Sequence, residues 1–133
     1  MLTTLVSGIA TAMLLTVPPA GARPHSPSMA SGPVGKEITV TGTVIDISCK
    51  FGQGLTGAAH VMCSQICADH GLPLAILGTD GKLYIPTSAG MPGDGQNARL
   101  REFAEQRVTI HGKAFRAAGA TAVQISSITV TPS

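Results

Sequence analysis

The sequence predicts a mainly β protein: a five-stranded, OB-fold-like β-barrel with one helix inserted between strands 1 and 2 and a second helix between strands 3 and 4. The candidate elements follow the order strand, helix, strand, strand, helix, strand, strand, which is the plan of this small Greek-key barrel with one added helix. The first strand also changes its apolar phase, as the bends of a small closed barrel require. An open α+β sheet built from the same elements is the alternative.

The first strand is expected over residues 36–48, where β-branched residues alternate with others. The apolar positions switch parity near residues 42–44, which indicates a β-bulge or a sharp bend. Asp46 lies on the parity that faces the barrel, and we expect its side chain to face a loop or to cap the inserted segment.

The inserted helix is expected over residues 56–70, with Thr56 as its N-cap and Gly71 as its C-terminal stop. Short strands follow at residues 72–77 and 82–87, and the Asp80-Gly81 pair between them predicts a hairpin turn.

Residues 88–96 are rich in glycine and small residues and are expected to form a loop. A short helix over residues 97–106 would place Leu100, Phe103 and Ala104 on its inner face. Two closing strands are expected at residues 107–115 and 121–130, joined by a turn at 117–120.

Three segments are expected along the chain: a signal peptide over residues 1–22, a disordered lead-in over 23–35 and the OB-like domain over 36–131. The apolar run at residues 5–17 is shorter than the roughly 20 residues that a membrane span needs, and small residues follow it at 20–22. A buried N-terminal helix is the alternative. We therefore expect a periplasmic or extracellular protein with no membrane insertion after signal cleavage.

Charge and aromatic content bear on the class of partner. The net charge is +2 with no basic run, and the chain has one Tyr, three Phe and no Trp. Nucleic acid is therefore not an expected partner, because the chain lacks both a phosphate-binding surface and faces on which bases stack. A protein of unknown identity is the partner that the sequence leaves open.

The candidate site is a cluster of cysteine and histidine residues. On an ideal helix, Cys63, Cys67 and His70 fall at about −60°, −20° and −80° from His60, so all four share one stripe about 80° wide. Cys49 ends the strand that precedes this helix. Sulfur and imidazole groups are therefore expected to converge where the inserted helix meets the first strand.

Thiolates with imidazole are ligands that suit zinc or copper(I). Cys49, His60, Cys63 and Cys67 would form a Cys3His site, with His70 as a substitute ligand or an outer group. The metal would then fasten the inserted helix to the first strand.

A disulfide is the alternative, because cysteines pair in an oxidising compartment and a bridge stabilises a small exported domain. Cys49 bonded to Cys63 or Cys67 would also fasten the helix to the strand, and the third thiol would be left over. The protein would then be a non-enzymatic binding module or an accessory subunit of a periplasmic assembly. A redox-active thiol is the third hypothesis.

Catalytic chemistry is not expected. The sequence has no Cys-x-x-Cys motif for haem attachment or for a thioredoxin-type dithiol. No base or oxyanion hole is marked beside a cysteine nucleophile either.

The motifs resemble those of a family of small exported bacterial OB-fold-like domains without an assigned function. The matching residues are the run from Thr41 to Cys49, the pattern His60-x2-Cys63-x3-Cys67 and the segment from Asp80 to Tyr84. The resemblance covers residues 37–130. It implies the barrel plan and implies that the three cysteines and His60 act together, and it identifies neither the metal nor the partner.

Overall fold

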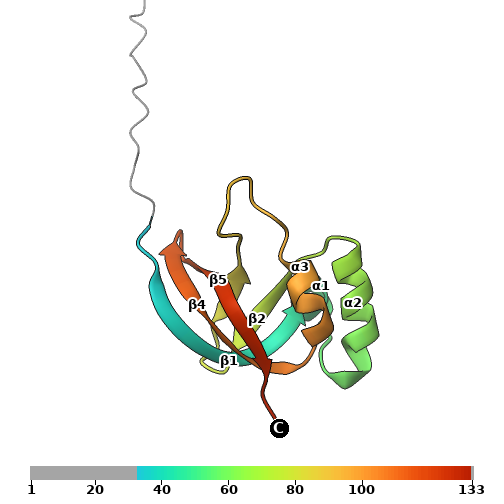
Figure 1. The fold of residues 1–133 in the computed structure, drawn as a ribbon. Helices are drawn as coiled ribbons and strands as arrows, with labels where there is room; N and C mark the ends of the chain where they lie inside the picture. Colours follow the sequence, from blue (N-terminus) through green and yellow to red (C-terminus); the bar gives the residue numbers. More distant parts are fainter. Residues whose placement is uncertain (1–32, 133) are drawn as a thin grey trace, which may run out of the picture. The chain divides into compact units, whose positions relative to one another are not determined.

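The computed structural model describes residues 33–132, so the expected signal peptide and nearly all of the expected lead-in lie outside the described residues. The strands are β1 (Lys36–Asp46), β2 (Leu74–Gly78), β3 (Leu83–Pro86), β4 (Arg107–Ala117) and β5 (Ala120–Val130). They close into a barrel in the order β1-β2-β3-β5-β4, with β1 pairing β4 (Figure 1). β3 and β5 are parallel and the other pairs are antiparallel. The predicted OB-like barrel is confirmed.

Strand β1 serves two neighbours. Its first part pairs with β4 and its second part with β2, and the two ladders overlap at Gly42 and Thr43. The strand can bend there because Gly42 has no side chain: an added Cβ would lie 2.5 Å from the carbonyl oxygen of Leu77.

Of the two features predicted near residues 42–44, a β-bulge or a sharp bend, β1 has no bulge. The ladders of β1 are continuous, and the register shift lies between β4 and β5 at His111 and Gly112. The apolar phase changes in β1 because both faces of its second half are covered. Val44 belongs to the barrel core. The neighbouring Ile45 points to the opposite face of the strand, and it is buried too. Helices α1 (Ile47–Gln53) and α2 (Val61–Asp69) contact β1.

The connection between β1 and β2 holds more helix than predicted. It contains α1, the 3-10 turn η1 (Ala58–His60) and α2. The expected strand end at residue 48 and helix start at Thr56 were both wrong, since the strand ends at Asp46 and α2 begins at Val61. Gly71 follows α2 with a φ of 87°, as expected of the residue that stops a helix.

The second helical segment is shorter than the predicted 97–106. It consists of α3 (Asn97–Leu100) and the 3-10 turn η2 (Arg101–Phe103). Leu100 is fully buried in the barrel core. The Asn97 amide donates to the carbonyls of Leu72 and Ala68 at 2.7 and 3.1 Å, so α3 is fixed to the C-terminal end of α2.

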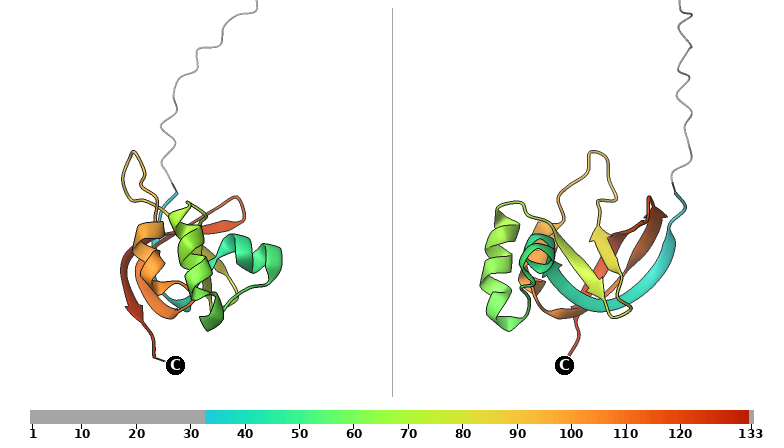
Figure 2. Two further views of the ribbon diagram at one scale, coloured as in Figure 1. Left: turned by 90° about the vertical axis from the view of Figure 1, so that its right-hand side faces the viewer. Right: turned by 180° about the vertical axis from the view of Figure 1, so that it is seen from behind.

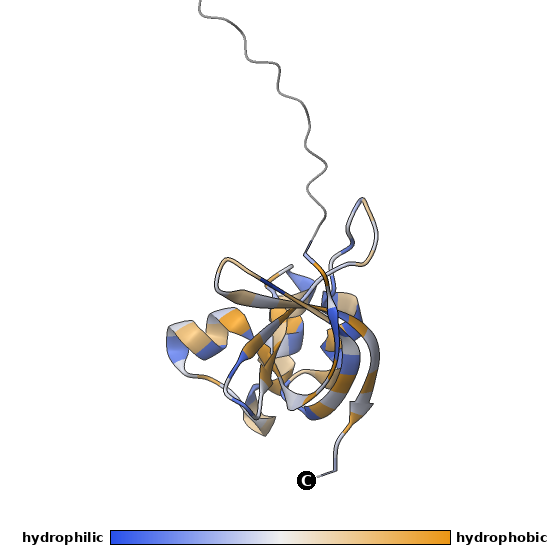
Figure 3. Cartoon of the chain, turned by 90° about the vertical axis from the view of Figure 1, so that its left-hand side faces the viewer, coloured by the Kyte–Doolittle hydropathy of each residue, from blue (hydrophilic) through white to orange (hydrophobic). Residues whose placement is uncertain are grey.

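The helices gather at the end of the barrel where β1 runs into α1, as the views from two sides show (Figures 1 and 2). Hydrophobic and hydrophilic residues alternate along the strands (Figure 3), as expected when one face of a strand packs inside a barrel. Among residues 33–132, no helix is both long enough and apolar enough to cross a bilayer.

Candidate metal centre

The end of β1 places the first cysteine. Asp46 is the N-cap of α1, and its Oδ1 accepts a hydrogen bond of 3.1 Å from the backbone N–H of Cys49. The backbone of Asp46 is extended and the next residues are helical, so the chain changes direction at this N-cap. Cys49 therefore lies buried in the first turn of α1, at the junction of barrel and insert, instead of at the end of the strand as predicted.

Helix α2 supplies the other thiols. His60, the N-cap residue of α2, and Ser64 within the helix are buried, Cys67 is half-buried and Cys63 is exposed. A bidentate ion pair holds the helix in place: the Nε and Nη2 atoms of Arg101 donate to the Asp69 carboxylate at 2.6 and 2.8 Å. This half-exposed ion pair links the C-terminal end of α2 to η2.

Two groups of ligand atoms result. The Sγ atoms of Cys49, Cys63 and Cys67 lie within 4.8 Å of one another. One ligand atom each from Asp46, Cys49 and His60 also lies within 4.8 Å of the other two. The predicted convergence of the thiols is confirmed, and Cys49 belongs to both groups.

The three cysteines are free thiols in this structure. Neither of the disulfides considered from the sequence, Cys49 with Cys63 or with Cys67, is formed. The thiols are therefore available as ligands in the geometry described.

His70 lies apart from these groups. It is the exposed C-cap residue of α2 and belongs to neither group of ligand atoms. The helical wheel explains this: His70 is beyond Cys63 on the stripe, and Cys63 already lies at the exposed edge of the docked helix.

Asp46 is the ligand candidate that sequence reasoning missed. Its expected role as a cap is confirmed, but its place beside Cys49 and His60 was not foreseen. An N-cap side chain accepts from the backbone N–H two or three residues later, and Cys49 follows Asp46 by three. This spacing in the sequence could have indicated that the two residues lie close together.

The carboxylate and the thiols alter one another's proton affinity. Burial by itself raises the pKa of Asp46, but the Cys49 backbone N–H and the thiols of Cys67 and Cys49 together bring it below its ordinary value of 3.8. The same carboxylate, together with burial, raises the pKa of Cys67 to about 12. Burial and Asp46 also raise the pKa of Cys49. An ionised carboxylate therefore faces two protonated thiols at neutral pH.

Three buried polar atoms at this site have no hydrogen-bond partner among the described residues: Asp46 Oδ2, His60 Nε2 and Ser64 Oγ. Leaving a buried polar group unsatisfied costs about 1–3 kcal/mol, so each of these atoms calls for a partner such as a bound ion or ordered water. Here two of the three belong to residues that can bind a metal ion.

Glu105 fixes the loop that leads to His60. Its Oε2 accepts hydrogen bonds of 2.8 Å from the Thr56 hydroxyl and from the Gly57 N–H. Glu105 itself has a φ of 60°, a backbone conformation rare outside glycine, and its N–H donates to the carbonyl of Val44 at 2.8 Å. The loop is thereby held against the barrel, and Thr56, predicted to be a helix cap, acts as one of its anchors.

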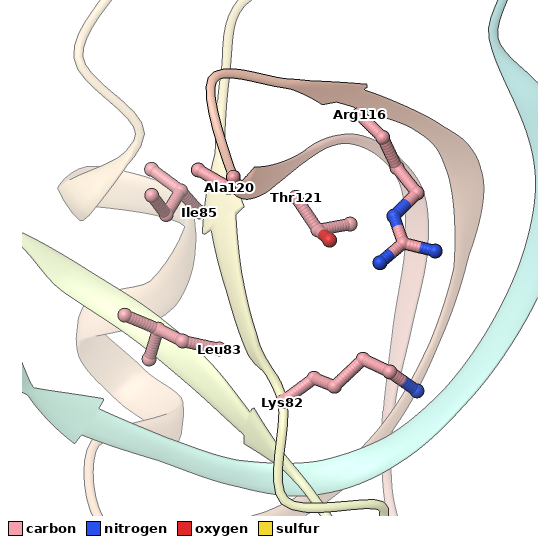
Figure 4. A pocket seen from close by; sticks show the side chains of 7 residues that line it. Lys82, Leu83, Ile85, Arg116, Ala120 and Thr121 are labelled. Atoms are coloured by element: carbon pink, nitrogen blue, oxygen red, sulfur yellow. The ribbon is translucent and has the colours of Figure 1, made fainter.

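A surface pocket of about 410 Å³ lies elsewhere on the barrel, between β3 and the β4–β5 hairpin (Figure 4). Lys82 and Arg116 extend along it beside Leu83, Ile85 and Thr121. Asp80 lies 2.6 Å from the Lys82 ammonium and balances its charge. The two basic residues therefore do not form a paired anion site, and the thiol cluster is the stronger functional candidate.

Comparison with protein-family models, with curated proteins and with solved structures found no match to this chain. The family resemblance of the motifs therefore stays a prediction. Function is inferred from the geometry of the described residues.

Proposed function

We propose that this chain is an exported metal-binding module that holds one thiophilic ion, copper(I) or zinc, on the thiolates of Cys49, Cys63 and Cys67. The observation that carries the proposal is that the three sulfur atoms lie within 4.8 Å of one another. They come from two helices joined by a loop that Glu105 fixes.

The distances are compatible with coordination. A metal–sulfur bond of about 2.3 Å puts two sulfur ligands of one ion about 3.8 Å apart in a tetrahedral site and about 4.0 Å apart in a trigonal one. Side-chain rotations that move the sulfur atoms by an ångström or less therefore suffice to close the site around an ion.

The chemistry of the ligands narrows the choice of ion. Soft thiolates select copper(I) or zinc over the oxygen-preferring magnesium and calcium ions. Three thiolates complete a trigonal copper(I) site, whereas zinc takes a fourth ligand. The His60 imidazole lies with Asp46 and Cys49 in the other group of ligand atoms, so water would take that fourth position.

A metal also accounts for the number of cysteines. A disulfide would use two of the three thiols, whereas an ion bound by all three leaves none unpaired. In an oxidising compartment, where thiols otherwise form disulfides, a bound ion would also protect them. The exposed Cys63 would keep the ion accessible to a protein partner.

The test is elemental analysis combined with thiol counting. The full chain is produced with its N-terminal segment, recovered from the periplasm without chelator and analysed for zinc and copper. We expect bound zinc or copper, three titratable thiols per denatured chain, and loss of the thiolate-bound ion in Cys63→Ser. His70→Ala is the matched control, because His70 lies outside both groups of ligand atoms, and it should keep the metal.

Two results would contradict this proposal. Metal-free protein with one free thiol per denatured chain would show a disulfide-stapled binding module instead. Failure of the chain to reach the periplasm would overturn the export part of the proposal.

A further inference from the structure

The second group of ligand atoms, from Asp46, Cys49 and His60, is more deeply buried than the three-thiol group. The residues are 1%, 6% and 7% exposed, respectively. By contrast, Cys63 and Cys67 in the three-thiol group are exposed and half-buried. We propose that this inner group binds a second ion, a divalent cation of the zinc class, and that the Cys49 thiolate bridges it to the thiolate-bound ion.

The unpartnered atoms carry this inference. Asp46 Oδ2 and His60 Nε2 are buried and have no hydrogen-bond partner among the described residues. Both belong to residues whose ligand atoms lie within 4.8 Å of each other and of the Cys49 sulfur. A bound cation would satisfy the two atoms together.

The charge of the site agrees with a divalent ion. Asp46 is buried and forms no ion pair with a lysine, an arginine or a histidine among residues 33–132. The Cys49 N–H stabilises this negative charge, but no basic side chain among the described residues neutralises it. With the Cys49 thiolate, the Asp46 carboxylate carries two negative charges, which one divalent cation neutralises.

The donor atoms also indicate the class of ion. One carboxylate oxygen, one imidazole nitrogen and one thiolate sulfur form a mixed set that zinc binds at about 2.0–2.3 Å, with a fourth position for water. Copper(I), in contrast, prefers the all-sulfur group.

Two ions explain the number of donors better than one. The cluster offers five donor residues: Asp46, Cys49, His60, Cys63 and Cys67. A zinc ion takes four ligands in a tetrahedral site, and the donors fall into two groups that share only Cys49. One ion per group, with a shared thiolate, uses every donor.

This inference rests on the proposed function for its outer ion, and the experiment separates the two. Reduced, metal-stripped protein is titrated anaerobically with copper(I), and then with cobalt(II) as the spectroscopic probe of a zinc-class site. We expect one equivalent of copper(I) and then one equivalent of cobalt(II), with the absorption bands of a tetrahedral site and a sulfur-to-cobalt charge-transfer band.

Two variants test the inner donors. Asp46→Asn retains an acceptor oxygen for the helix cap, and His60→Ala removes the imidazole. Each should bind copper(I) as the parent protein does and bind cobalt(II) at least tenfold more weakly. Ser64→Ala is the matched control, because it removes a buried hydroxyl that belongs to neither group, and it should retain both ions.

The outcomes distinguish the two proposals. Cobalt(II) binding that survives in Cys63→Ser, without copper(I) binding in the parent protein, would support the inner site and overturn the outer one. One equivalent of copper(I) with no cobalt(II), or cobalt(II) binding that both Asp46→Asn and His60→Ala leave unchanged, would falsify the second ion. Ordered water would then be the partner of the buried atoms.

Discussion

The Oδ1 atom of Asp46 accepts the backbone N–H of Cys49 at 3.1 Å, so the residue that ends the first strand also begins the first helix. This one contact turns the chain out of the barrel and sets the first thiol in the interior. It also brings a carboxylate against two thiols: the pKa of Asp46 is lowered, and the pKa values of Cys49 and Cys67 are raised.

Removal of the cap should destabilise the protein. Asp46→Ala loses the acceptor for the Cys49 N–H, and we expect the free energy of unfolding of the metal-free protein to fall by about 1–2 kcal/mol. Asp46→Asn retains an acceptor and should lose clearly less. Chemical denaturation followed by circular dichroism measures both, and equal losses would show that charge, rather than capping, is what stabilises the turn.

The Asp46 carboxylate should also contribute to acid sensitivity. Its pKa in the folded protein is below its ordinary value of 3.8, so its stabilising contribution is present above that value and is lost as the pH falls through the folded pKa. The difference in unfolding free energy between the parent protein and Asp46→Asn should therefore be constant near neutral pH and shift below about pH 4. Other acidic groups are common to both proteins and cancel in this difference. A difference that stays constant down to pH 2 would contradict the assignment.

The thiols should react in a fixed order. Cys63 is exposed, whereas Cys49 is buried and the pKa of Cys67 is raised to about 12. Because the thiolate is the nucleophile, native metal-free protein treated with iodoacetamide at neutral pH should be alkylated first at Cys63. Peptide mass spectrometry identifies the site, and denatured protein, with all three thiols modified, is the control. Rapid modification of Cys67 would instead favour the hypothesis of a redox-active thiol.

Metal affinity should rise with pH. The raised pKa values of Cys49 and Cys67 mean that these thiols hold protons at neutral pH, and an incoming ion must displace them. For each proton displaced, the dissociation constant of the metal should fall about tenfold for every unit by which the pH rises. Competition titrations with a chromophoric chelator at pH 6, 7 and 8 measure the slope, after correction for the chelator's own protonation. A dissociation constant independent of pH would exclude thiols as the ligands.

The bend of β1 should depend on Gly42. A Cβ at this position would lie 2.5 Å from the carbonyl oxygen of Leu77, which is backbone that cannot move aside without disturbing the β1–β2 ladder. Gly42→Ala should therefore destabilise the barrel by about 1–3 kcal/mol. Gly52→Ala, in the exposed part of α1 with no atom within 4 Å of the added Cβ, should be neutral or slightly stabilising. Thermal melting of the two variants side by side makes the comparison.

Much of the fold could be predicted because its signals are local. The alternation of β-branched residues, the Asp80-Gly81 turn and the glycine after α2 each act over a few residues, and the order of the elements then indicates the barrel. The convergence of Cys63 and Cys67 is equally local, because residues four apart on a helix share a face.

The remaining features depend on how the insert packs. Helix α1 has no clear apolar period, and it forms because Asp46 caps it and β1 leaves the barrel at that point. His70 and Cys63 share a stripe with His60, but the docked orientation of α2 buries His60 and leaves the other two exposed. The sequence by itself determined which residues could act as ligands and that they lie near one another. Only the tertiary structure decided which of them meet, because the facing side of a helix is set by its packing partners and not by its own spacing.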